Sequence, residues 1–166
     1  VSHLVISNTG LPTGMDVYNF TKAAPFLLWR CMVMILGQNL PVSALFSFDT
    51  GRSIAGCYGY AAPFPDARYR AGVAKWPLLV PIFSRMAVAA DMREARAFLG
   101  TWEKPTLVCF SDSDPITRGA NKDMLQLIPG ARGFPEVTIK GAAHFLQDTH
   151  SAEICERVVE FLKKAK

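Results

Sequence analysis

Two aspartates and one histidine stand directly after strand-like segments of this 166-residue chain. Asp112 and Asp114 follow the apolar run at 105–110, and His144 follows the β-prone run at 136–140. In open α/β sheets, functional residues gather just beyond the carboxyl ends of strands, and consecutive parallel strands usually lie side by side. We therefore expect an aspartate and His144 to face each other at one end of a sheet.

The pairing of an aspartate with a histidine would supply a general base. The carboxylate fixes the tautomer of the ring and stabilises its cation, so that the second ring nitrogen takes a proton from water. Asp112 and Asp114 are rivals for the acid, because Asp112 is nearer the strand and Asp114 lies deeper in the turn before Pro115. The plainer interpretation is a turn beside a packed, hydrogen-bonded histidine.

A nucleophile for this base is not evident within the chain. No Gly-x-Ser-x-Gly elbow occurs. The stretch SFDTG at 47–51 resembles an elbow with Asp49 in the place of the nucleophile. No strand-then-helix context surrounds it, so a turn inside a helical segment is the simpler explanation.

The elements that must position these residues follow from hydrophobic periodicity and from Gly and Pro. We expect strands at 3–7, 105–110 and 136–140, and helices at 16–38, 61–77, 86–102, 119–128 and 151–165. Asp16 is a possible cap of the first helix, and the second would start at Pro65-Asp66 and end or kink at Pro77. The segment 39–65 is ambiguous. Apolar strands that alternate with helices predict a parallel sheet covered on both faces.

The composition is that of a globular chain, with 50% hydrophobic residues, 19% charged residues and a net charge of +4. We interpret Lys163, Lys164 and Lys166 as the solvated end of the last helix. The most apolar run, 25–37, contains Arg30 and is too short to span a bilayer. Neither a nucleic acid nor a membrane is therefore expected as a partner.

The four cysteines are widely separated and form no CxxC motif: Cys31, Cys57, Cys109 and Cys155. Three lie in apolar stretches, so we expect buried thiols in a reducing compartment, with a cytoplasmic location, rather than a disulfide or zinc site. The chain begins with Val1 next to a strand-like run, so we also expect an N-terminal part to be missing. The lack of a signal peptide is then uninformative.

Four stretches of the chain are specific when taken together. They are VISNTGLPTG (5–14), GYAAPFPDARYRAGVAKWPLLVP (59–81), EKPTLVCFSDSDPITRG (103–119) and IPGARGFPEVTIKGAAHFLQD (128–148). Across essentially the whole chain, they resemble the C-terminal part of haloalkane dehalogenases. The resemblance implies an α/β-hydrolase fragment, made of the last three parallel strands with flanking helices plus an inserted helical cap. Its implied parts are a core strand and turn (1–14), the cap (15–85) and the C-terminal part of the core (86–166).

The resemblance also implies roles for the strand-end residues. Asp114 would be the acid and His144 the base of a catalytic triad, whose aspartate nucleophile and oxyanion-hole loop would precede this chain. Asp112 does not align with the acid. One branch of the family places its acid just after the strand that here reads LVIS. Because Asn8 stands there, with no carboxylate before Asp16, the chain resembles the other branch.

The cap of that branch carries a tryptophan whose indole N–H binds the leaving halide. Trp29 stands 31 residues before Tyr60, which is the spacing of the family. Phe26, one turn earlier, would line the same pocket, and four further residues align with pocket-wall positions: Trp76, Pro77, Val80 and Ile116. The plainer interpretations are a core anchor of the cap for Trp29 and ordinary packing for the pocket-wall residues.

Two features depart from the family pattern. Ala143 precedes the base where the family usually has glycine, and its methyl group would crowd the loop if the backbone must be glycine-like there. The cap segment between Phe46 and Tyr58 matches no part of the family that we recognise.

The implied reaction is hydrolysis of a carbon–halogen bond to an alcohol and a halide through a covalent alkyl ester. Its implied partners are a small apolar halogenated substrate and water, with no metal or organic cofactor, and the complete protein is expected to be a monomer. One alternative is epoxide hydrolysis by the same scheme, for which cap tyrosines exist at Tyr58, Tyr60 and Tyr69. The other is a truncated, inactive α/β-hydrolase-like chain that aggregates or stays partly molten.

Overall fold

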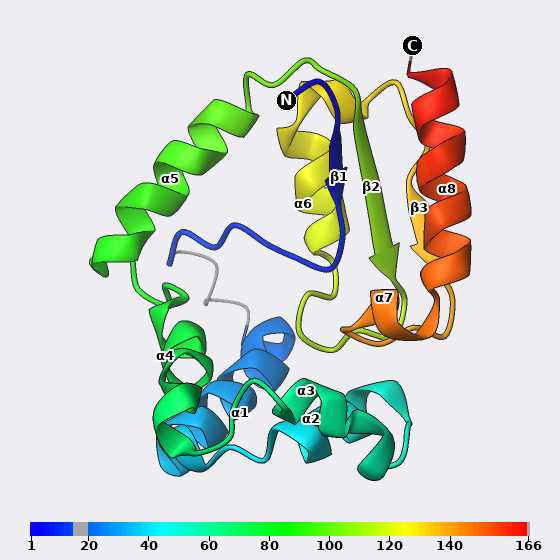
Figure 1. Ribbon diagram of the computed structural model, residues 1–166. Helices are drawn as coiled ribbons and strands as arrows, with labels where there is room; N and C mark the ends of the chain where they lie inside the picture. Colours follow the sequence, from blue (N-terminus) through cyan, green and yellow to red (C-terminus); the bar gives the residue numbers. More distant parts are fainter. Residues whose placement is uncertain (15–19, 166) are drawn as a thin grey trace. The chain divides into compact units, whose positions relative to one another are not determined.

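The computed structural model describes residues 1–14 and 20–165 (Figure 1). The chain forms two compact units, which we call the core unit (Val1–Leu11 with Ala90–Lys166) and the helical unit (Pro12–Ala89). Asp16, the expected cap of the first helix, lies outside the described residues.

A parallel sheet of three strands forms the centre of the core unit. Its strands are β1 (Leu4–Ile6), β2 (Thr106–Ser111) and β3 (Val137–Ile139), and β2 lies between the other two. Leu4 of β1 pairs with Thr106, and Cys109 pairs with Val137 of β3. The three expected strands and their parallel arrangement are confirmed.

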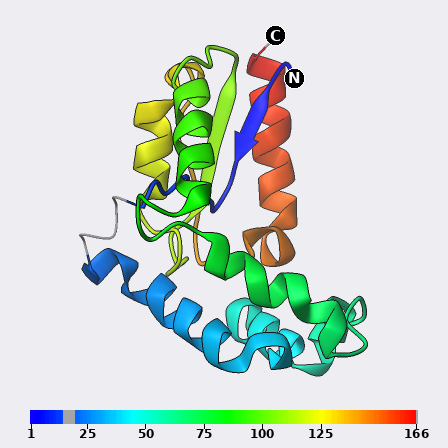
Figure 2. The same cartoon turned by 90° about the vertical axis from the view of Figure 1, so that its left-hand side faces the viewer.

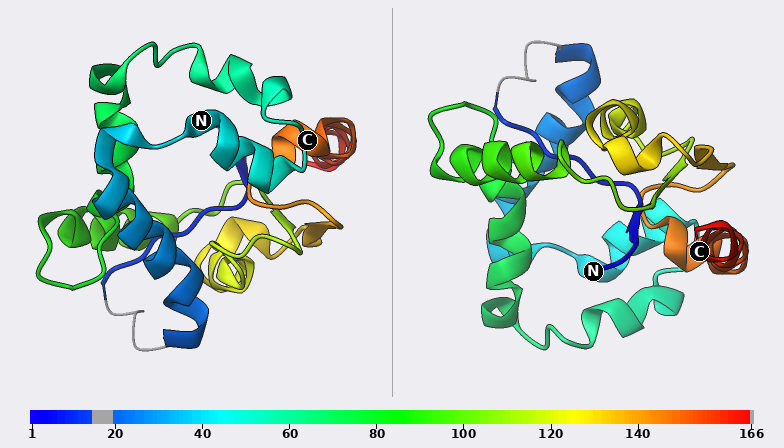
Figure 3. Two further views of the ribbon diagram at one scale, coloured as in Figure 1. Left: turned by 90° about the horizontal axis from the view of Figure 1, so that it is seen from below. Right: turned by 90° about the horizontal axis from the view of Figure 1, so that it is seen from above.

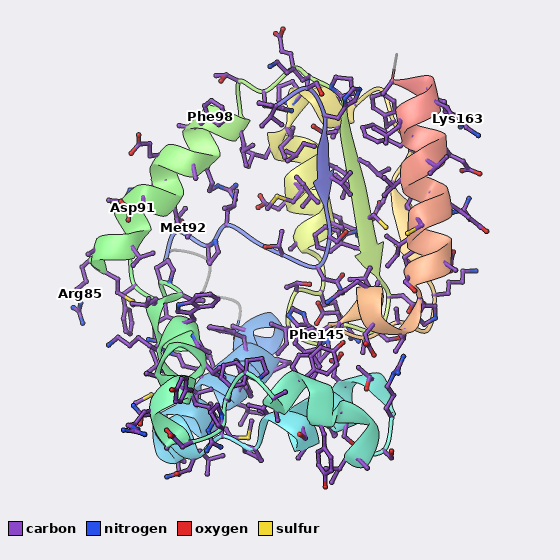
Figure 4. The ribbon with its side chains drawn as sticks, viewed as in Figure 1. Arg85, Asp91, Met92, Phe98, Phe145 and Lys163 are labelled. Atoms are coloured by element: carbon purple, nitrogen blue, oxygen red, sulfur yellow. The ribbon has the colours of Figure 1, made fainter. Side chains whose placement is uncertain are left out.

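Helices cover both faces of this sheet, as expected. The helices of the unit are α5 (Ala87–Leu99, most of which belongs to this unit), α6 (Ala120–Leu127), α7 (Leu146–Thr149) and α8 (Ser151–Lys164), with a 3₁₀ helix at Pro129–Ala131. α6 lies on one side of the sheet and α8 on the other (Figures 2 and 3). Asp91 of α5 and Lys163 of α8 point away from the sheet (Figure 4).

The central strand supplies both layers of the core, because successive side chains of a strand point to opposite faces. One layer contains Ile6, Val108, Phe110, Met124, Ile128 and Ala131, and the other contains Leu107, Cys109, Ile139, Ala142, Leu146 and Phe161. Full burial of a large apolar side chain stabilises a fold by about 2 kcal/mol. β2 is therefore the anchor of the core unit, which explains why its four middle residues, 107–110, are all apolar.

In its described part, the helical unit holds four complete α-helices joined by short 3₁₀ helices. The α-helices are α1 (Phe20–Leu36), α2 (Val42–Thr50), α3 (Tyr58–Ala61) and α4 (Ala71–Leu79), and the 3₁₀ helices are Gly37–Asn39, Ala55–Cys57 and Ala67–Arg70. The ambiguous segment 39–65 thus holds α2 and α3. Asp66 accepts the backbone N–H of Arg68 at 2.9 Å and caps the 3₁₀ helix that leads into α4.

The C-terminal end of α4 is held by a side chain of α1. The Arg30 guanidinium donates to the carbonyls of Pro77 and Leu78, both at 2.8 Å, and of Val80 at 3.0 Å. The last carbonyls of a helix have no partner within the helix, so this arginine supplies the donors that they lack. Pro77 itself lies in the last turn of α4, near the expected end of that helix.

The expectation of buried thiols is right for two cysteines and wrong for Cys31. All four cysteines are free thiols, of which Cys57 and Cys109 are buried while Cys31 and Cys155 are exposed. Cys31 shares a face of α1 with Leu28 and Ile35, which are 71% and 82% exposed. An apolar run therefore did not reveal which face of the helix is buried. In the described part of the chain, no helix is both long and apolar enough to cross a membrane.

Candidate functional site

Asp114 and His144 meet at the carboxyl ends of two neighbouring strands. Asp114 lies in the loop after β2, and His144 lies in the segment 140–145 after β3, which we call the base loop. Nδ1 of His144 is 2.9 Å from Oδ2 of Asp114. The carboxylate is buried, whereas the side chain of His144 is 31% exposed. The juxtaposition expected from the strand ends is therefore present.

Asp114 is held by its own turn as well as by the histidine. The backbone N–H of Ile116 donates to Oδ1 at 2.7 Å, and the hydroxyl of Thr117 donates to Oδ2. An ionised carboxylate accepts hydrogen bonds and donates none, so Nδ1 of His144 carries the proton of this contact. In the neutral ring, Nε2 is then the basic nitrogen. This tautomer is the one that a general base requires.

The surroundings of Asp114 keep it ionised. Burial acts to raise the pKa of its carboxyl, because a charged group loses its hydration there. The hydrogen bonds from His144 and Thr117, the charge of His144 and the N–H of Ile116 outweigh burial, and the pKa lies below its ordinary value. The carboxylate can therefore stabilise an imidazolium on His144.

Asp112, the rival candidate for the acid, contacts the backbone of the base loop instead. Its Oδ1 accepts the N–H of Gly141 at 2.8 Å and the hydroxyl of Ser113 at 2.9 Å. The Gly141 contact is the largest cause of the lowered pKa of Asp112. The side chain is exposed. Asp114 therefore contacts the ring of His144, whereas Asp112 contacts the backbone of the base loop at Gly141.

Asn8 also contacts the base loop, which was not apparent from the sequence. Its carboxamide donates to the carbonyls of Ala143 and His144 at 3.0 and 2.9 Å. Asn8 has a φ of 33° and is the only non-glycine residue in the described part of the chain with positive φ. Ala143 thus has an ordinary backbone, and its methyl group does not conflict with a glycine-like conformation.

The cap candidates lie on α1, on α4 or just after α4. Phe26 and Trp29 are one turn apart on α1 and partly buried, Trp76 and Pro77 lie on α4, and Val80 follows it. Trp76 is 75% exposed. Ile116 belongs to the core unit, where it follows Asp114. The halide site and the pocket that these residues would form stay a prediction.

The stretch SFDTG is the end of a helix and not a nucleophile elbow. Asp49 lies in the last turn of α2, and Gly51 ends that helix with a φ of 69°. The element before α2 is a 3₁₀ helix rather than a strand. Asp49 therefore lacks the strand-to-helix turn that exposes a nucleophile.

A cavity of about 350 Å³ lies between β3 and α8 in the core unit. Phe134, Val137 and Phe161 line it together with Arg157 and Lys164, and neither member of the Asp–His pair does. We therefore do not assign the chemistry to it. Among residues 1–14 and 20–165, no group of three or more His, Cys, Asp or Glu side chains could hold a metal ion.

Curated proteins with similar sequences carry the name haloalkane dehalogenase. One from Mycobacterium marinum is 35% identical over 163 residues, 97% of this chain and 53% of that protein. Haloalkane dehalogenase 1 of Mycobacterium tuberculosis is 36% identical over 163 residues, 97% of this chain and 52% of that protein. The chain thus spans about half the length of these relatives. No family model matches the chain.

Solved structures of haloalkane dehalogenases have the same fold. The tetrameric structure of DpaA from Paraglaciecola agarilytica matches 94% of this chain and 50% of its own, with a TM-score of 0.78 and 22% identity. DatA from Agrobacterium tumefaciens matches 86% of this chain and 52% of its own, with a TM-score of 0.67 and 18% identity. The resemblance found in the sequence and the α/β-hydrolase fragment that it implied are confirmed.

Proposed function

We propose that this chain, a relative of haloalkane dehalogenases that spans about half their length, contributes the acid, the base and the cap of an enzyme that hydrolyses carbon–halogen bonds. The observation that carries the proposal is the buried carboxylate of Asp114 against Nδ1 of His144. That contact lies at the strand ends of a fold shared with dehalogenase structures. The nucleophile is proposed to lie in a part of the protein outside these 166 residues.

The first step forms a covalent ester. A carboxylate oxygen attacks the carbon that bears the halogen, and the halide leaves with the electron pair of the broken bond. Trp29 is our candidate for the halide contact, because an indole N–H donates a hydrogen bond and offers no acceptor. Phe26, Trp76, Pro77, Val80 and Ile116 are candidates for the walls of a dry, apolar pocket around the alkyl chain.

The second step releases the alcohol. Nε2 of His144 takes a proton from water, whose oxygen attacks the carbonyl carbon of the ester. Asp114 stabilises the imidazolium, which then gives its proton to the departing alkoxide. The carboxylate is regenerated, and one proton is released for each halide. His144 is therefore needed to hydrolyse the ester but not to form it.

The test is halide release from 1,2-dibromoethane by the protein that carries this chain, compared with turnover of styrene oxide. We expect bromide and protons in equal amounts, and little opening of the epoxide. The variant His144→Gln should release bromide once and then stop, and its mass should show the trapped alkyl ester. Epoxide opening without bromide release, or full turnover by His144→Gln, would contradict the proposal.

A further inference from the structure

Asn8 links the carboxyl ends of all three strands. It follows β1 and is 8% exposed. Its Oδ1 accepts the backbone N–H of Ser111, at the end of β2, at 3.0 Å. Its Nδ2 donates to the hydroxyl of Ser111 at 2.8 Å and to the carbonyls of Ala143 and His144, beyond β3, at 3.0 and 2.9 Å. We propose that Asn8 is a positioning residue for His144, an inference that rests on the proposed function.

The orientation of the amide is fixed by its partners. The backbone N–H of Ser111 can only donate, so it requires the oxygen of Asn8. The carbonyls of Ala143 and His144 can only accept, so they require the nitrogen. The assignment therefore does not depend on telling oxygen from nitrogen by position alone.

The backbone of Asn8 narrows the choice of residue further. A φ of 33° is uncommon outside glycine, and Asn and Asp adopt positive φ more readily than other side chains. Aspartate would offer an acceptor to Ser111 but no donor to the two carbonyls. Glycine would fit the backbone and make none of the contacts. Asparagine meets the conformational and the hydrogen-bonding requirements together.

These contacts hold the base loop at backbone groups that neither aspartate contacts. The hydroxyl of Ser111 also donates to the carbonyl of Ala143 at 3.0 Å. Asp114 thus holds the ring of His144 at Nδ1, and Asn8 holds the backbone carbonyl of the same residue. A catalytic group must be placed to within about 0.5 Å by such supports. Losing them should slow the step that uses the ring, which is ester hydrolysis.

The experiment compares Asn8→Asp with Asn8→Gly in the protein that carries this chain. The aspartate keeps the shape of the side chain and the contact with the N–H of Ser111, but it loses the donors to the two carbonyls. The glycine accommodates the positive φ, so this second variant serves as the test if the aspartate variant folds poorly. Rapid-mixing kinetics with 1,2-dibromoethane separate bromide release from ester hydrolysis. We expect both variants to hydrolyse the ester at least about tenfold more slowly, with bromide release in the first turnover unchanged. The alkylated protein should therefore accumulate.

Proton NMR provides a second measurement that does not need activity. The Nδ1 proton of His144, bonded to a carboxylate, should give a resolved downfield resonance in the unaltered protein, and it should broaden or shift in both variants. Asn121→Asp is the matched control, because Asn121 donates to Glu136 elsewhere in the core unit, and it should leave both measurements unchanged. An unchanged resonance overturns the inference, and so does equal slowing of the two steps. If the unaltered protein releases no bromide, the proposed function fails while the resonance still decides the role of Asn8.

Discussion

Asp112 and Asp114 are only two positions apart, but we expect different roles for them because their carboxylates contact different partners. Asp114 is buried against an imidazole, and Asp112 is exposed against the backbone N–H of Gly141. We expect Asp114→Asn to slow ester hydrolysis about 100-fold or more, because the imidazolium loses its charge partner. Asp112→Asn keeps an acceptor for Gly141, so the same rate should fall by much less. Single-turnover measurement of ester hydrolysis checks this, and a larger loss in Asp112→Asn would exchange the two roles.

The lowered pKa of Asp114 makes stability depend on pH. Because the folded-state pKa lies below the unfolded value of about 3.9, the ionised form stabilises the fold above that pH. This contribution is lost as the pH falls through the folded pKa. We expect Asp114→Asn to cost about 2 kcal/mol near neutral pH, from the weakened hydrogen bonds to a charged group. The difference in Tm between the unaltered protein that carries this chain and its Asp114→Asn variant should shrink below about pH 4. A difference that stays constant to pH 2 would contradict this.

The sequence predicted the Asp–His pair but not the role of Asn8, for a physical reason. A buried strand followed by an acid, and the next strand followed by a histidine, indicate a shared site because parallel strands end at the same side. The contact from Asn8 to the carbonyl of Ala143 joins residues 135 positions apart. It depends on the direction of backbone groups in the base loop, which residue types do not encode.

Among the connecting elements, the 3₁₀ helix at Pro129–Ala131 packs closely against the segment before β2. Gly130 is buried, and its N–H donates to the carbonyl of Trp102 at 2.8 Å. A Cβ there would lie 2.0 Å from the backbone oxygen of Lys104, so the backbone would have to shift. We expect Gly130→Ala to cost about 3 kcal/mol, measured as a lower Tm of the protein that carries this chain. Gly133→Ala, at an exposed position where the added Cβ has no atom within 4 Å outside the residue and its two chain neighbours, should change stability by less than about 0.5 kcal/mol.

At the scale of elements, strands were easier to predict than helix faces. The runs that became β1, β2 and β3 are short, apolar and bounded by Gly, Pro or polar residues, which leaves few alternatives. α1 is apolar on several sides, so its periodicity did not predict that Cys31 would be exposed. The segment 39–65 was ambiguous because its short helices are interrupted by Gly and Pro.

The whole chain exposes much apolar surface in both units. Val1, Ile35 and Phe48 are 89%, 82% and 90% exposed, and β1 forms one edge of the sheet in the described part of the chain. An unpaired strand edge binds other strands, and contiguous apolar surface promotes association. Because the chain spans about half the length of its relatives, we expect the 166 residues by themselves to aggregate or to stay partly molten. A monomer with a cooperative thermal transition would count against this.

Association of the isolated chain could proceed through the edge strand β1 or through its exposed apolar surface in general. Adding the same charge to β1 and to a helix distinguishes these two routes. Val5 on β1 is 40% exposed and Val159 on α8 is 48% exposed, so Val5→Lys and Val159→Lys add equal charge at similar exposure. A lysine on an edge strand opposes pairing with another strand, whereas a lysine on a helix only raises the net charge. We therefore expect Val5→Lys to increase the monomer fraction of the isolated chain, measured by light scattering after gel filtration, clearly more than Val159→Lys does. Equal effects would show that association proceeds through the apolar surface at large and not through β1.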